Sequence, residues 1–197
     1  MTTARRPGFE YMALDDFEEL LADKPADEKW ELIGGRVIRM MVGARWEHKR
    51  IVQNITSAML TTFRAKGSSC RPYDETFWLK EAPLDLAVFP DVMVRCGDLA
   101  SGAASLSDPT VIVEVLSDGS SRRDRIEKWA LYQTLPSLAH YALVSRDEAR
   151  VEIMDRHDGE WTGLRLLSRA DDLLAFPAVD FEMTLIEVYR DVLTFSG

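Results

Sequence analysis

Two acidic residues interrupt apolar segments of this chain, and they are the side chains best placed to do chemistry. Glu114 stands inside the otherwise apolar segment Val111–Leu116, and Asp91 follows Pro90 at the start of a second apolar run. An unpaired carboxylate in a buried strand is costly, so each acid needs a cation, hydrogen bonds or a raised pKa. Two such acids on neighbouring strands predict a pair of carboxylates that converges on a metal ion.

A metal held by these acids would favour phosphate chemistry. Mg²⁺ and Mn²⁺ accept oxygen ligands and keep several waters, and such an ion activates water and stabilises negative charge on a phosphate. Lys128 lies about two turns into the helix expected after the Glu114 strand, so its ammonium could reach the same place. Each residue alone also has a structural explanation. Asp91 could cap a turn, Glu114 could form a core ion pair, and Lys128 could lie on the surface.

The spacing of apolar residues predicts the elements that must position these side chains. Helical spacing occurs at 14–22 and 46–64, and 30–41 is typical of a hairpin turning at Gly34 and Gly35. The order of elements indicates an α/β or α+β domain with a mixed central sheet flanked by helices. The other expected elements are strands at 73–80, 84–95, 110–116, 140–144, 151–155 and 161–167, a loop at 97–109, a helix at 122–135 with a capping box of Ser121 and Asp124, and a strand and short helix within 176–193.

The helix at 122–135 determines where Lys128 can point. Ile126, Trp129 and Ala130 form its expected apolar face, and Lys128 lies at the margin of that face. Such a position is compatible with a cleft and equally with solvent.

Composition and charge limit the class of protein. With 46% hydrophobic and 29% charged residues the chain resembles a folded globular protein, and no apolar run approaches the roughly 20 residues of a membrane span. The segment 1–7 lacks the apolar core of a secretory signal. Cys70 and Cys96 show no metal-ligand spacing and no disulfide framework, so we expect reduced thiols and a cytoplasmic protein. A net charge of −9 opposes simple nucleic-acid binding without excluding it, since acids at a metal site would be neutralised by bound cations.

Short motifs follow one another along the chain in a distinctive order. They are Trp30–Gly35, His48 ahead of the long helix, Pro90-Asp91, Glu114–Ser117, Arg123–Arg125 with Lys128 and Tyr132, and His140–Val144. This order resembles the Uma-two type of restriction endonuclease family, which belongs to the PD-(D/E)XK nuclease superfamily. The resemblance covers roughly residues 12–190, almost the whole chain.

The resemblance implies a restriction-endonuclease-like core of helix, three strands, helix and strand, with metal ligands on the second and third strands. Asp91 and Glu114 match those ligands. The usual superfamily motif has a lysine two residues after the glutamate, where this chain has Leu116. In this family the lysine stands in the following helix, and Lys128 matches that position.

Two further residues match the family pattern. Glu31 resembles an acid that could approach the metal, and His48 could contact phosphate. The structural alternatives are a surface acid in the hairpin and a side chain at a helix start. The resemblance also implies one nuclease-like domain over residues 1–197, with the helix and hairpin at about 12–42 packed on its core.

The function that these residues favour is a Mg²⁺- or Mn²⁺-dependent endonuclease that hydrolyses phosphodiester bonds in DNA. Asp91 and Glu114 would bind the metal, and Lys128 would position water or stabilise the transition state. An alternative is a catalytically inactive nuclease-fold protein that binds nucleic acid or has a regulatory role. The acidic charge also leaves open a hydrolase of smaller phosphorylated substrates. We expect DNA as the substrate, no membrane association, and a homodimer, because symmetric pairs are common and DNA has two strands.

Overall fold

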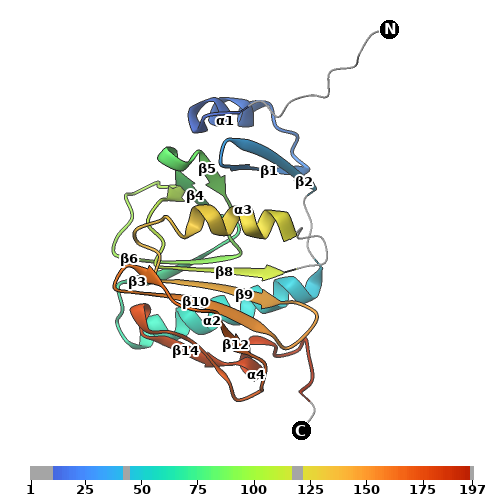
Figure 1. Cartoon of the computed structure of the whole chain (residues 1–197), viewed down its shortest axis with the longest axis vertical. Helices are drawn as coiled ribbons and strands as arrows, with labels where there is room; N and C mark the ends of the chain where they lie inside the picture. Colours follow the sequence, from blue (N-terminus) through green and yellow to red (C-terminus); the bar gives the residue numbers. More distant parts are fainter. Residues whose placement is uncertain (1–10, 42–44, 117–121, 196–197) are drawn as a thin grey trace.

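The computed structural model describes residues 11–41, 45–116 and 122–195, and a mixed seven-stranded sheet lies at the centre of these residues (Figure 1). Its strands are β3 (Cys70–Asp74), β6 (Val92–Cys96), β8 (Val111–Leu116), β9 (His140–Ser145), β10 (Val151–His157), β11 (Glu160–Trp161) and β12 (Arg165–Leu167). The order is β11-β10-β9-β8-β6-β3, with β12 beside β10. Because β8 and β9 are parallel while β6 and β8 are antiparallel, the predicted mixed sheet is confirmed.

A second sheet lies beside the first and begins with a tight hairpin. Its strands are β1 (Glu28–Ile33), β2 (Arg36–Met41), β4 (Trp78–Glu81), β5 (Leu86–Val88) and β7 (Ser105–Leu106), in the order β2-β1-β5-β4-β7. The turn between β1 and β2 consists of Gly34 and Gly35, whose φ angles of 55° and 77° suit a two-residue hairpin turn. The expected hairpin is therefore confirmed.

Strand β1 has two different faces because side chains alternate along it. Trp30 and Leu32 pack against Phe17 of helix α1 (Leu14–Leu20). Glu31 has the opposite parity, as does Ile33, which packs in the cluster on the α3 (Arg122–Tyr132) side of the central sheet. A charged residue of the hairpin thus faces the interior between the two sheets.

The two long helices cover opposite faces of the central sheet (Figure 1). Val111, Val113 and Val115 of β8 join the cluster built on helix α2 (Trp46–Ala65). Ile112 has the opposite parity and packs in the cluster that contains Tyr132 of α3. Glu114 shares the parity of Ile112, so alternation alone directs its side chain toward α3.

The last part of the chain completes the α2 side. Strands β13 (Leu173–Phe176) and β14 (Phe181–Thr184) form a hairpin, and α4 (Leu185–Val188) follows directly. Their apolar side chains join the cluster of α2. Short 3-10 helices occur at Leu21–Asp23, Ala82–Leu84 and Pro177–Val179.

Several expected details differ from the structure. The segments 73–80 and 84–95 are each interrupted, giving β3 to β6, and the expected loop at 97–109 contributes β7. The predicted apolar face of α3 is confirmed at Trp129, which packs on Tyr141, but it is wrong at Ile126, which is 58% exposed, and at Ala130, which is also exposed. Polar partners on the inner side, described below, hold the helix in this orientation. The capping box of Ser121 and Asp124 lies outside the described residues and side chains.

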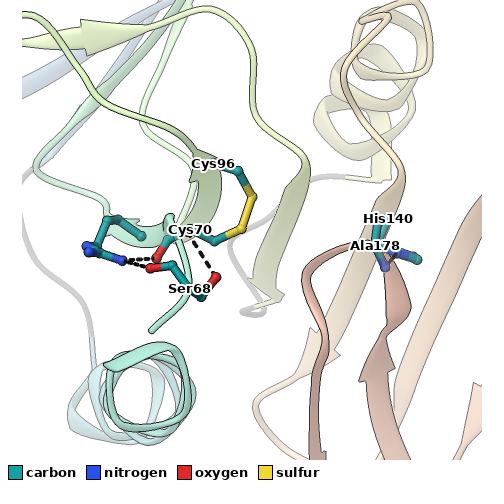
Figure 2. Close-up of a disulfide and its surroundings, with 6 residues drawn as sticks. Ser68, Cys70, Cys96, His140 and Ala178 are labelled. Atoms are coloured by element: carbon teal, nitrogen blue, oxygen red, sulfur yellow. Dashed lines mark hydrogen bonds between the residues drawn. A yellow bond between two sulfur atoms is a disulfide. The ribbon is translucent and has the colours of Figure 1, made fainter. Parts of the chain in front are cut away.

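The two cysteines correct the expectation of reduced thiols. Cys70 and Cys96 form a disulfide, and they stand directly opposite one another in the antiparallel pair β3–β6 (Figure 2). The bond joins residues 26 positions apart, a spacing that carries no pairing signal by itself. Strand register brings the two thiols together, and register depends on the whole sheet.

Candidate active site

The central sheet brings Asp91 and Glu114 to the same place. Asp91 directly precedes β6, which pairs with β8 in the register Val92 opposite Val113. The backbone N–H of Val115, the residue after Glu114, donates a 2.7 Å hydrogen bond to Asp91 Oδ2. The other Asp91 oxygen, Oδ1, lies 3.0 Å from Nε2 of His48 on α2. Asp91 is therefore fixed by one strand and one helix.

Helix α3 supplies two partners to Glu114. The Nζ of Lys128 lies 3.3 Å from Glu114 Oε1, and the Tyr132 hydroxyl donates a 3.1 Å hydrogen bond to the same oxygen. Lys128 and Tyr132 are four residues apart, so they share one face of the helix. That shared face points inward because both side chains find a carboxylate there.

Glu31 reaches this centre from the second sheet. Its Oε2 lies 3.2 Å from Lys128 Nζ, and its Oε1 accepts a 3.0 Å hydrogen bond from the backbone N–H of Phe89. The residue is 2% exposed, so it is a core acid rather than a surface acid of the hairpin. Lys128 consequently bridges two carboxylates, Glu31 from one sheet and Glu114 from the other.

The buried charges shift one another's protonation. Burial raises the pKa of Glu114 to about 7, with the charges of Asp91 and Glu31 adding to the rise and Lys128 opposing it. Burial alone would lower the pKa of Lys128, but the carboxylates of Glu114, Glu31 and Asp91 outweigh it and raise that pKa. The protein therefore favours an ammonium at Lys128, whereas the carboxylate form of Glu114 is disfavoured near neutral pH and would be stabilised by a bound cation.

The structure adds two residues that sequence reasoning missed. Glu75, just after β3, places a carboxylate oxygen near His48 and Asp91, and these three ligand atoms lie within 4.8 Å of one another. Lys29 lies on β1 two residues before Glu31, and burial lowers its pKa although the charges of Glu31 and Asp91 oppose the change. Neither residue interrupts an apolar run, so neither had a local signal in the sequence.

The structure thus gathers all five of the residues singled out in the sequence. Asp91 contacts His48, Glu114 contacts Lys128, and Lys128 contacts Glu31. Among the described residues, Asp91, Glu75 and His48 form the group whose ligand atoms lie close enough together to hold a divalent cation, and Glu114 is not part of that group. Acids that can hold a cation, with a lysine beside them, have the chemistry needed to polarise and hydrolyse a phosphate ester.

The chain is similar to several known proteins. The chain is 28% identical over 148 residues to the uncharacterized protein sll1609 of Synechocystis sp. This alignment covers 73% of this chain and 82% of that protein. It is 25% identical over 189 residues to slr1290 of the same organism, covering 95% and 97% of the two chains. The crystal structure of a "putative nuclease belonging to DUF820" from Anabaena variabilis superposes with a TM-score of 0.73. That match is 18% identical and covers 92% of this chain and 99% of the other, so it shows a shared fold.

A family model covers most of the chain. The Uma2 model, whose description is "Putative restriction endonuclease", matches residues 14–187. That range contains both sheets, helix α3 and every residue of the candidate active site. The chain therefore belongs to the Uma2 family of restriction-endonuclease-like proteins.

Proposed function

We propose that the protein is a metal-dependent endonuclease that hydrolyses phosphodiester bonds in DNA. The observation that carries the proposal is the position of Lys128, whose Nζ lies 3.3 Å from Glu114 and 3.2 Å from Glu31. A lysine that stands in the helix after the strand can act in catalysis only if its ammonium reaches the acids, and Lys128 contacts both Glu114 and Glu31. Membership of a family described as restriction endonucleases supports the same activity.

The donor atoms suit Mg²⁺ or Mn²⁺. Asp91 and Glu114 present carboxylate oxygens from adjacent strands, and Glu114 Oε2 has no hydrogen-bond partner among the described residues. One or two carboxylates completed by water is the usual protein environment of Mg²⁺. When bound there, the cation would supply Lewis acidity and lower the pKa of water near the scissile phosphate.

The protein's own residues would orient the attacking water, stabilise the transition state and hold the metal ligands in place. The Lys128 ammonium would orient the attacking water or donate to a phosphate oxygen as negative charge develops. Glu31 and Tyr132 would hold Lys128 and Glu114 in place, and neither would need to contact the substrate. His48, whose Nε2 lies 3.0 Å from Asp91 Oδ1, would orient that carboxylate and would lie close enough to contact a bound phosphate.

A plasmid-nicking assay with Mg²⁺ or Mn²⁺ tests the proposal. We expect cleavage by the wild type and a fall of about 100-fold or more in Asp91→Asn, Glu114→Gln and Lys128→Gln. Lys66→Gln is a matched control, because Lys66 also forms an ion pair with an acid but lies at the far end of α2. The control should cleave like the wild type.

Two results would count against the proposal. If all three site variants cleave DNA as fast as the wild type, Asp91, Glu114 and Lys128 are not the catalytic residues. DNA binding without cleavage under any divalent cation would favour the inactive, nucleic-acid-binding alternative, and the retained acids and lysine argue against that outcome.

We further propose that residues 1–197 act as one nuclease domain and as a homodimer that addresses both strands of DNA. We also propose a cytoplasmic location, which no longer has the support of reduced thiols because Cys70 and Cys96 form a disulfide. None of the helices among the described residues is long and apolar enough to cross a membrane. Light scattering coupled to gel filtration measures the mass in solution. A mass near 22.4 kDa, that of a single chain, would contradict the dimer.

A further inference from the structure

A pocket of about 410 Å³ opens beside the candidate active site. Three of its lining residues are already connected with that site. Glu75 groups with His48 and Asp91, Lys29 precedes Glu31 on β1, and the Phe89 backbone donates to Glu31. A ligand in this pocket would therefore lie next to a phosphate bound at the acids.

Aromatic rings form the apolar part of the pocket. Trp78 and Phe89 are both half-buried and line it, with ring centroids 3.6 Å apart and planes inclined by 33°. Trp30, which is 5% exposed, is a third aromatic residue that lines the pocket. Half-exposed rings in a concave site are the surfaces on which nucleobases stack in single-stranded nucleic-acid binding proteins.

Lysines stand between these rings and the acids. The Lys29 Nζ lies 4.6 Å from the centre of the Phe89 ring and donates to the backbone oxygen of Glu75 at 3.4 Å. Lys49 forms an ion pair with the Glu75 carboxylate, so the charge of this acid is already balanced. Two ammonium groups at the junction of an aromatic pocket and a cation-binding site match the phosphates on either side of a nucleoside.

We propose that this pocket receives an unpaired nucleobase next to the scissile phosphate, so that the substrate is single-stranded or locally opened DNA. The inference rests on the proposed nuclease function and specifies its substrate. A base inside a duplex is stacked and paired, and it must leave the helix before a protein pocket can enclose it. Contact of the base with the exposed parts of the Trp78 and Phe89 rings, which already pack on each other, would then select unpaired nucleotides without reading their sequence.

Binding by the Glu114→Gln variant tests the pocket without turnover. Fluorescence anisotropy with Mg²⁺ compares a short oligothymidylate with an oligomer of the same length and charge whose sugars carry no base. We expect the base-bearing oligomer to bind about tenfold more tightly, which corresponds to ~1.4 kcal/mol. This comparison needs no pocket variant, so it does not depend on how such a variant folds.

Pocket variants then assign the preference to residues. In the same background, Phe89→Leu should remove most of the difference between the two oligomers. Phe77→Leu is the matched control, because Phe77 is also half-buried but packs on Tyr73 outside the pocket. Lys49→Gln should weaken both oligomers alike by about threefold or more, because it removes a positive charge and leaves the Glu75 carboxylate unpaired beside the expected phosphate. Lys66→Gln, whose side chain is equally exposed at 45%, should change neither.

The outcomes separate this inference from the proposed function. Equal binding of the two oligomers, or an equal loss for both in Phe89→Leu, would overturn the pocket assignment. Nicking of duplex plasmid together with no single-strand binding would overturn it and leave the endonuclease proposal standing. If the wild type neither binds nor cleaves any DNA, both proposals fail.

Discussion

At the residue scale, the site is built around a lysine held between two acids. Lys128 is only 16% exposed at its side chain, and its two partners, Glu31 and Glu114, come from different sheets. A buried charge with one partner removed is strongly destabilising, so each member of this group supports the others. The arrangement explains why a charged stripe of α3 faces inward while Ile126 faces solvent.

The role of Glu31 can be separated from that of a metal ligand. Its Oε1 accepts from the Phe89 N–H, and its Oε2 lies 3.2 Å from the Lys128 ammonium, whose positive charge opposes a cation on the same oxygen; this favours a positioning role. In Glu31→Gln we expect cleavage to fall about 10–100-fold because Lys128 loses a charged anchor. The rise in melting temperature that Mn²⁺ produces should be unchanged, whereas Glu114→Gln should lose it. A smaller Mn²⁺ effect in Glu31→Gln would instead make Glu31 a ligand.

Tyr132 offers a second test of positioning. Its hydroxyl donates to Glu114 Oε1, and Phe at this place removes that bond without removing the ring. The matched control is Tyr189→Phe, because Tyr189 is equally buried and its hydroxyl bonds the backbone of Arg150. Both variants should lose about 1 kcal/mol of unfolding free energy in urea titrations. Only Tyr132→Phe should also cleave more slowly, by about tenfold; equal activities would contradict the role.

At the element scale, local sequence patterns predicted most of the helices and strands but not which strands pair with one another. Alternation in β8 and the periodicity of α2 were readable because each depends on neighbouring residues. The pairing of β1 with β5, Leu32 opposite Ala87, was not, since it joins residues far apart in the chain. That pairing brings Glu31 to Lys128, so the second anchor of the lysine depended on tertiary structure.

The disulfide is also a property of paired elements, and its contribution is measurable. It closes a loop of 26 residues between β3 and β6, and the chain-entropy model gives such a loop about 3.5 kcal/mol. Dithiothreitol should therefore lower the unfolding free energy of the wild type by about 2–4 kcal/mol. The Cys70→Ala/Cys96→Ala double variant should start from the lower value and not respond to the reductant. A wild type that does not respond either would contradict a stabilising bond.

At the scale of the whole molecule, the candidate site lies where the two sheets and helix α3 meet. The hairpin sheet provides Glu31, the central sheet provides Asp91 and Glu114, and α3 provides Lys128 between them. The motifs along the sequence named these four residues because three acids and a lysine stood at the family's positions. Glu75, which reaches the site from the turn after β3, became recognisable only through the folded arrangement.

A histidine outside the candidate active site, His140, should make stability depend on pH. His140 Nδ1 lies 2.7 Å from Asp155, and its Nε2 lies 3.1 Å from the Ala178 N–H, which it accepts only when unprotonated (Figure 2). The ring thereby ties β9 to the 3-10 helix inside the C-terminal hairpin. Burial lowers the pKa of His140; the hydrogen bond and charge of Asp155 oppose this, and the charges of Arg165 and His157 add to it.

The sign of the effect follows from where the proton binds. The unfolded chain protonates this histidine near its ordinary pKa of about 6.5, and the folded protein does so only at lower pH. Between the two values the unfolded state holds more protons, so stability falls as pH drops through about 6.5 toward the lowered pKa. Urea midpoints measured from about pH 8 to about pH 5.5 should decline more steeply for the wild type than for His140→Gln. His48 and His157 are present in both proteins, so they contribute equally to both pH dependences. If the urea midpoints of the two proteins decline in parallel, His140 is not the group responsible.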